Sequence, residues 1–122
     1  MMTLIDTNVI LRYLLNDIAE QADEAVAVID AGAFTLPEIV AEVVYVLTKL
    51  YNVPRAKIHG IVAPIFDEVA VEHHGVIRTA LARYSETKFD FVDCLILARK
   101  ELLGEDVFTF DKKLRNRLTG AL

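Results

Sequence analysis

The stretch Thr3-Leu4-Ile5-Asp6-Thr7-Asn8-Val9-Ile10-Leu11 decides the fold, and it stands almost at the start of the chain. Residues 2–5 are apolar and are typical of a short buried strand. Asp6 ends this strand, and the apolar residues after it recur at helical spacing. In open α/β sheets, ligands bind outside the carboxyl ends of the strands. Asp6 therefore occupies a position where a functional site is expected.

The composition indicates one globular domain over residues 1–122. The chain has 122 residues, of which 54% are hydrophobic, which suffices for a core and excludes disorder. It contains no apolar run of about 18 residues, so we expect no membrane span. The strand starts without a preceding basic segment, so no signal peptide is expected. The single cysteine, Cys94, permits no internal disulfide and fits a core thiol in a reducing cytoplasm.

The net charge of −5 argues against a general nucleic-acid binder. The charge is uneven along the chain, however. Residues 99–122 carry six basic and four acidic side chains, whereas residues 1–98 have a net charge of −7.

Strands alternate with helices in the predicted order of elements. The predicted strands are residues 2–5, 33–36, 68–72 and 107–110. Helices are predicted directly after Asp6, over 20–30 and 37–51, from Pro54 onward, over 76–84 and 90–103, and from Asp111 to near Leu118. This alternation predicts a three-layer α/β/α fold with a central, mainly parallel sheet of four to five strands.

Several carboxylates follow these strands or begin the helices after them. Asp6 follows the first strand and Asp111 the last, while Asp90 and Asp93 stand at the start of a nearly all-apolar helix. Asp6, Asp90 and Asp111 could also be ordinary N-caps, since aspartate is favoured there. Asp93 fits that explanation less well, because it lies about one turn inside its helix among apolar residues.

Glu42 is expected at the edge of the apolar stripe of the 37–51 helix. That stripe is predicted from Ile39, Val43, Val46, Leu47 and Leu50, with its centre near Val43. A glutamate that borders a core is costly unless it is paired or bound to a cation.

Carboxylates that converge at one sheet edge would repel one another unless a cation held them. Mg²⁺ and Mn²⁺ take oxygen ligands of this kind. The sequence has neither a His/Cys cluster with zinc spacing nor a glycine-rich phosphate loop. A carboxylate site with Mg²⁺ suits phosphodiester hydrolysis, in which the metal activates water.

Four segments in this order resemble the PIN domain, and most of all the VapC-type toxins of prokaryotic toxin–antitoxin pairs. They are "LIDTNVILRYLL", "LPEIVAEVVYVL", "FDFVDCLILARK" and "VFTFDKKL". The resemblance covers nearly the whole chain and implies a PIN-like fold.

The resemblance implies a Mg²⁺- or Mn²⁺-dependent endoribonuclease whose catalytic and metal-binding acids are Asp6, Glu42, Asp93 and Asp111. It also implies supporting roles beside this site for Asn8, Asp90 and Thr109. The implied partners are an RNA substrate, a cognate antitoxin and a second copy of the chain, paired through the apolar helices of its first half. The alternatives are a PIN nuclease that processes RNA outside a toxin pair, which a neighbouring antitoxin gene would exclude, and a non-catalytic PIN-like module that binds RNA or protein.

Two other readings of the acidic residues fail. Haloacid-dehalogenase-like phosphatases need a second aspartate where this chain has Asn8, and response-regulator receivers need paired acids before the final residue of the first strand. His59, His73 and His74 lie outside the motifs and are expected on the surface. Arg12 is expected on a solvated face of the first helix.

Overall fold

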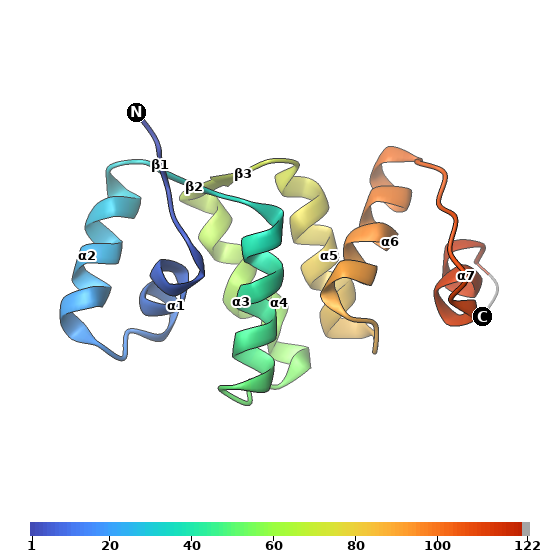
Figure 1. Cartoon of the computed structure of the whole chain (residues 1–122), viewed down its shortest axis with the longest axis horizontal. Helices are drawn as coiled ribbons and strands as arrows, with labels where there is room; N and C mark the ends of the chain where they lie inside the picture. Colours follow the sequence, from blue (N-terminus) through green and yellow to red (C-terminus); the bar gives the residue numbers. More distant parts are fainter. Residues whose placement is uncertain (121–122) are drawn as a thin grey trace.

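The computed structural model describes residues 1–120 and contains a sheet of three short parallel strands (Figure 1). The strands are β1 (Thr3–Leu4), β2 (Ala33–Thr35) and β3 (Val69–Val71), and they lie in the order β1-β2-β3. In the register of the sheet, Thr3 lies opposite Ala33, and Ala33 lies opposite Val69. The predicted α/β class with a parallel sheet is therefore confirmed.

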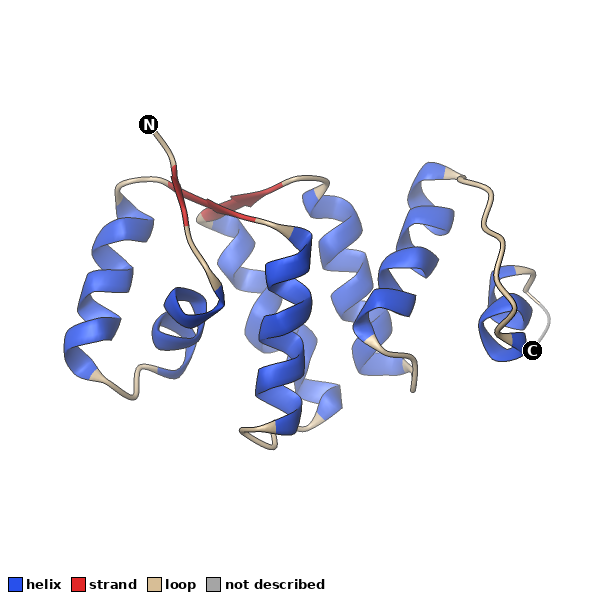
Figure 2. Cartoon of the chain, viewed as in Figure 1, coloured by secondary structure: helices blue, strands red, loops and turns tan. Residues whose placement is uncertain are grey.

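Helices make up most of the described chain (Figure 2). The α-helices are α1 (Thr7–Leu15), α2 (Ala19–Asp30), α3 (Pro37–Lys49), α4 (Ile58–Val62), α5 (His74–Glu86), α6 (Phe91–Leu103) and α7 (Lys112–Leu118). Two 3₁₀ turns, η1 (Arg55–Lys57) and η2 (Ala63–Asp67), flank α4. No helix in this part of the chain is long and apolar enough to cross a membrane.

Local sequence signals account for the ends of several helices. Asp6, Asp90 and Asp111 each cap the N-terminus of the following helix with a side-chain oxygen. Pro37 stands in the first turn of α3, where its missing N–H leaves no hydrogen bond unmade. Gly104 ends α6 in the left-handed conformation, with φ of +66°, which glycine adopts without a steric penalty.

The core lies on one face of the sheet. Ala33, Thr35 and Val69 point to this face and are buried, and α1, α3, α4, α5 and α6 contribute most of the remaining core. Figure 2 shows the strands along one side of the molecule, with α1 to α5 reaching away from them. On the opposite face of the sheet, Leu4 is 49% exposed and Ala70 is also exposed. The sheet is therefore packed on one face and partly open on the other.

The predicted fourth strand is absent from the part of the chain that the structure describes, so the expected count of four to five strands is wrong. Residues 107–110 are not in a sheet, and Phe108 and Phe110 are 79% and 84% exposed. This segment leaves α6 on the side away from β1 (Figure 1). β propensity predicts an extended backbone, but a strand also requires a neighbouring edge to pair with.

The helices also depart from prediction in two places. The segment after Pro54 is divided between η1, α4 and η2, since Gly60 and Pro64 weaken a continuous helix. The apolar stripe of α3 is rotated relative to the predicted one. Its buried residues are Val40, Val43, Val44 and Leu47, whereas Leu50 is 69% exposed.

We predict that truncating the centre of α3 destabilises the protein far more than truncating its end. Leu47 is fully buried, so Leu47→Ala should lower the free energy of unfolding by about 2–5 kcal/mol, through lost burial and a residual cavity. Leu50→Ala is the matched control and should change it by no more than about 0.5 kcal/mol. Urea denaturation followed by circular dichroism measures both. Equal losses for the two variants would contradict the observed burial of α3.

Candidate active site

Asp6 is placed by the junction between β1 and α1. The N–H of Ile5 donates to the carbonyl oxygen of Phe34 at 2.9 Å, and the Thr35 hydroxyl donates to the carbonyl oxygen of Ile5 at 3.1 Å. These bonds fix the end of β1 against β2. The Asp6 carboxylate then accepts the N–H of Val9 at 3.1 Å and starts α1.

Asp6 and Asn8 line the same surface hollow between α1 and α2. It has a volume of about 300 Å³ and is also lined by Arg12 and Glu24. Asn8 is predicted to support Asp6, but within residues 1–120 no hydrogen bond joins the two side chains.

Arg12 corrects one expectation, because it does not lie on a solvated helix face. Only 11% of its side chain is exposed. Its guanidinium donates to the Asp17 carboxylate at 3.0 Å and to the Tyr51 hydroxyl at 3.1 Å. Arg12 therefore joins the α1–α2 turn to the end of α3, and sequence reasoning missed this because both partners are set by the fold.

Glu42 lies on an exposed face of α3 rather than beside the core, so the expected cost of burying it does not apply. It lines a cavity of about 500 Å³ together with Asp90, which stands at the start of α6. The same cavity is lined by three basic side chains, those of Lys49, Arg55 and Lys88. Acidic and basic groups thus share one hollow between α3 and α6.

Arg55 is held in this cavity by Tyr84. Its Nε donates to the Tyr84 carbonyl oxygen at 2.7 Å, and its guanidinium carbon lies 3.7 Å from the centre of the Tyr84 ring. The Nη2 atom is buried without a hydrogen-bond partner in the described residues. Because a buried donor without a partner is costly, this atom is suited to an anionic ligand. No pattern in the sequence indicates this role of Arg55, because its environment depends on Tyr84, which lies 29 positions further along the chain.

Asp93 stands in a strongly acidic environment. Partial burial is the main cause that raises its pKa, and the negative charges of Asp90 and Asp111 raise it further. Asp90 also accepts the backbone N–H of Asp93 at 2.8 Å, which fixes the first turn of α6. The fold thus brings Asp90, Asp93 and Asp111 within electrostatic range of one another.

Thr109 positions the backbone before α7. Its hydroxyl accepts the N–H of Asp111 at 3.1 Å, and the Asp111 carboxylate in turn accepts the N–H of Leu114 at 2.8 Å. The Arg115 side chain donates to the Thr109 carbonyl oxygen. Thr109 therefore contacts the backbone of Asp111, and its supporting role at the site stays a prediction.

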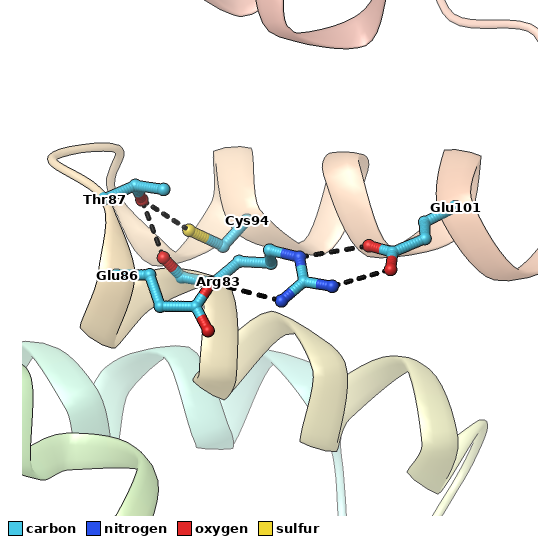
Figure 3. A network of polar contacts seen from close by, with 5 residues as sticks. All are labelled: Arg83, Glu86, Thr87, Cys94 and Glu101. Atoms are coloured by element: carbon cyan, nitrogen blue, oxygen red, sulfur yellow. Dashed lines mark hydrogen bonds and ion pairs between the residues drawn. The ribbon is translucent and has the colours of Figure 1, made fainter. Parts of the chain in front are cut away.

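A network of polar contacts holds α6 against α5 (Figure 3). Arg83 of α5 makes two hydrogen bonds to the Glu101 carboxylate, at 2.6 and 3.1 Å, and one to Glu86 at 3.2 Å. Thr87 contacts the Cys94 sulfur at 3.8 Å and donates to the Arg83 carbonyl oxygen at 2.7 Å. Burial raises the pKa of the Cys94 thiol, as expected for a core cysteine. This network fixes the helix that carries Asp90 and Asp93.

The four predicted metal-binding acids do not form one cluster within a single chain. No three Asp, Glu, His or Cys side chains among residues 1–120 are close enough to hold a metal ion together. Glu42 shares a cavity with Asp90, Asp93 lies near Asp111, and Asp6 lines a separate hollow. The side chains of these four acids offer only carboxylate oxygens, which are the ligands that Mg²⁺ and Mn²⁺ prefer. A bound cation would also offset the repulsion between Asp93 and its acidic neighbours. Their role in metal binding remains a prediction.

These features define a small parallel α/β protein with aspartates directly after β1 and at the starts of α6 and α7. The profile of the PIN domain family matches residues 3–117, and the chain belongs to this family. A protein from Aquifex aeolicus (strain VF5), named "VapC ribonuclease", is 29% identical over an alignment of 122 positions, and this alignment covers 93% of this chain and 90% of that protein. No solved structure shows a significant match.

We predict that Asp93→Asn stabilises the metal-free protein at neutral pH. A pKa that is raised in the folded state means that ionising Asp93 costs stability as the pH rises through the carboxyl range. The gain at pH 7 should be less than about 1 kcal/mol, since the side chain is partly exposed. It should vanish below about pH 3, where the wild-type carboxyl is protonated in both states.

Denaturant titrations in the presence of a chelator measure this difference, with Asp23→Asn of α2 as the control. A destabilising effect of Asp93→Asn at neutral pH, or a gain that grew on acidification, would contradict the assigned cause.

Proposed function

We propose that this protein is a Mg²⁺- or Mn²⁺-dependent endoribonuclease that acts as the toxin of a type II toxin–antitoxin pair in the cytoplasm. Membership of the PIN family and the similarity to the A. aeolicus protein named VapC ribonuclease support a nuclease. The observation that carries the proposal is the cavity between α3 and α6. It combines two carboxylates, which suit a hard cation, with three basic groups, which suit a polyanion.

In this proposal Asp6, Glu42, Asp93 and Asp111 supply the oxygen ligands. The bound cation would activate a water molecule and neutralise charge on the scissile phosphate. Asp90 fixes the first turn of α6 and so orients Asp93, while Thr109 fixes the backbone of Asp111. Asn8 stands beside Asp6 in the same hollow.

The basic residues of the cavity are proposed to hold the RNA backbone. Lys49 and Lys88 are exposed, and the partly exposed Arg55 lines the same cavity. Tyr45 of α3, which is 60% exposed, lines the same cavity and offers a ring for base stacking. A locally basic path explains how an acidic chain can bind RNA, because screening limits charge effects to about 10 Å at 0.1 M salt.

The cognate antitoxin is proposed to bind the same acidic groups. An arginine of such a partner would pair with Asp6 or Glu42 through charge-assisted hydrogen bonds and compete with the metal. Residues 1–98, with their net charge of −7, favour a basic segment electrostatically. A toxin role, as opposed to RNA processing, requires that expression of the chain arrests growth and that a neighbouring gene relieves the arrest.

We predict that RNA cleavage requires added Mg²⁺ or Mn²⁺ and stops in the presence of a chelator. Glu42→Gln and Asp93→Asn should each lower the cleavage rate by about 100-fold, because each removes a charged metal ligand. Glu38→Gln, one turn away on α3 and exposed, is the matched control and should retain activity. Cleavage of a fluorescent RNA measures the rates. Full activity of Asp93→Asn, or activity independent of metal, would refute the assignment.

We further predict that Lys49→Glu combined with Lys88→Glu weakens RNA binding by about tenfold or more near physiological salt and lowers the salt dependence of binding. The reason is the loss of two phosphate contacts. Lys57→Glu, which reverses an exposed charge in η1 outside the cavity, should have a smaller effect. Fluorescence anisotropy in an Asp6→Asn background separates binding from cleavage. Equal effects of the cavity and control variants would place the RNA elsewhere.

A further inference from the structure

The hollow between α1 and α2 contains polar side chains that make no contact with the rest of the described chain. The two helices pack side by side, on the left in Figure 1. The hollow has a volume of about 300 Å³ and is lined by Asn8 of α1 and by Gln21 and Glu24 of α2. All three side chains are exposed, and none makes a hydrogen bond or ion pair within residues 1–120. A few convergent polar groups in a concave site are the usual mark of a ligand-binding pocket.

Apolar side chains lie deeper in the same hollow. Ala25 is buried, and Val9 and Val28 are half-buried, whereas the polar residues around them are exposed. A flat ring with a polar edge suits this arrangement, because its face can contact the apolar groups while its edge meets the polar ones. Nucleobases have this shape, and proteins recognise unpaired bases through both the face and the edge.

The charges in the hollow favour a ligand with hydrogen-bond donors over a phosphate group. Asp6 and Glu24 are acidic, and Arg12 is the basic residue that lines the hollow. The Arg12 guanidinium already donates to Asp17 and to the Tyr51 hydroxyl, at 3.0 and 3.1 Å. Two carboxylates beside a guanidinium that is already paired repel an anion. The base of a nucleotide is therefore expected to enter this hollow, and the phosphate is expected to stay outside.

The polar side chains of α2 match the pairing edge of one base. Gln21 and Glu24 are three positions apart on α2 and therefore lie on the same face. A carboxylate only accepts hydrogen bonds, whereas a glutamine amide can also donate them. Guanine is the standard base whose edge has two adjacent donors, N1–H and the N2 amino group, beside the acceptor O6. In adenine, cytosine and uracil an acceptor stands next to the donor, and a carboxylate would repel it.

We propose that the hollow between α1 and α2 binds one unpaired guanine of the RNA substrate, with Glu24 and Gln21 as the specificity-determining residues. Glu24 accepts from N1–H and from the N2 amino group, and the Gln21 amide donates to O6. The inference rests on the proposed nuclease function and names its substrate class, which is RNA with a guanine in a loop or a single strand. Because Asp6 lines the same hollow, the bound guanine stands next to the proposed metal site.

An arginine side chain of a protein partner is the competing ligand. A guanidinium also presents adjacent donors to a carboxylate, so Glu24 alone does not distinguish the two. The amides of Asn8 and Gln21 favour the base. An arginine side chain has no acceptor and would leave their N–H groups unpaired, whereas guanine offers O6.

Binding of short RNAs tests the base preference without relying on cleavage. Fluorescein-labelled oligouridines with one central guanine, hypoxanthine or adenine are titrated with the wild-type chain at low salt in the presence of a chelator. Fluorescence anisotropy measures the affinities. Hypoxanthine lacks the N2 amino group and so loses one hydrogen bond to the Glu24 carboxylate. We expect the guanine RNA to bind about tenfold more tightly than the hypoxanthine RNA, because hydrogen bonds to charged groups are strong.

Glu24→Gln should change the preferred base from guanine to adenine. Glutamine places an acceptor beside a donor, and these match the N6 amino group and N1 of adenine. Glu20→Gln is the matched control, since Glu20 is exposed one turn earlier on α2 and does not line the hollow. This variant should keep the preference for guanine. Circular dichroism should show that both variants fold, because both positions are exposed.

Four results of these titrations would overturn the proposal. They are equal binding of the three RNAs by the wild type, no binding of any of them, an unchanged preference in Glu24→Gln, and the same change in Glu20→Gln. A fifth concerns the competing ligand. If arginine amide displaced the guanine RNA at lower concentration than guanosine monophosphate did, the hollow would belong to a protein partner instead.

Sequencing the ends of cleaved RNA separates failure of this proposal from failure of the proposed function. With Mg²⁺ present, the wild type should cut at a fixed position relative to an unpaired guanine, and Glu24→Gln should cut relative to adenine. Metal-dependent cleavage without a base preference would refute the guanine site and leave the nuclease intact. Selective binding of the guanine RNA without any cleavage would refute the nuclease and support the guanine site.

Discussion

A buried hydrogen bond between two short strands underlies the geometry of this protein. Thr35, a buried polar residue, donates its hydroxyl to the carbonyl oxygen of Ile5 at 3.1 Å. Strands of two and three residues have few ladder bonds, so each additional bond carries much of their alignment. This bond fixes the residue directly before Asp6. The direction of α1, and with it the hollow lined by Asp6 and Asn8, follows from that one junction.

The aspartates of the candidate site also serve the helices on which they stand. Asp6, Asp90 and Asp111 are N-caps, and each cap contributes about 1 kcal/mol to helix stability. The same aspartate can therefore cap its helix and also take part in the proposed active site. An asparagine in their place preserves the cap while removing the charge, since Asn caps helices as well as Asp does. Loss of function in such a variant can then be assigned to the charge.

Much of the fold follows from local sequence, and the remainder depends on contacts between distant residues. The order Ile5, Asp6, Val9 specifies a strand, a cap and a helix without reference to any other part of the chain. By contrast, the sequence could not show that residues 107–110 lack a neighbour, because their pattern is that of an ordinary strand. Glu42 was predicted at the edge of a core, but the α3 stripe is centred on Val40, Val43, Val44 and Leu47, which leaves Glu42 exposed. The predicted and observed stripes differ because α1 and α6 decide which face of α3 is buried.

The same division applies to the candidate site. Its acids could be selected from their places after strands and in first turns, but the basic side of the cavity could not. The Arg55 side chain is held by the ring and the carbonyl group of Tyr84, and the Arg12 side chain is held by Asp17 and Tyr51. Such contacts have no periodicity in the sequence, so they become visible only when the elements are packed.

The bridge made by Arg12 has a consequence for how the molecule opens. Since its guanidinium joins the α1–α2 turn to the end of α3, these three helices should exchange their amide hydrogens as one cooperative unit. Helix α7 has only seven residues, of which Leu114 alone is buried. Helix α7 should therefore unfold at a lower free-energy cost than the other helices. We expect its amide hydrogens to exchange first, while α1, α2 and α3 remain folded.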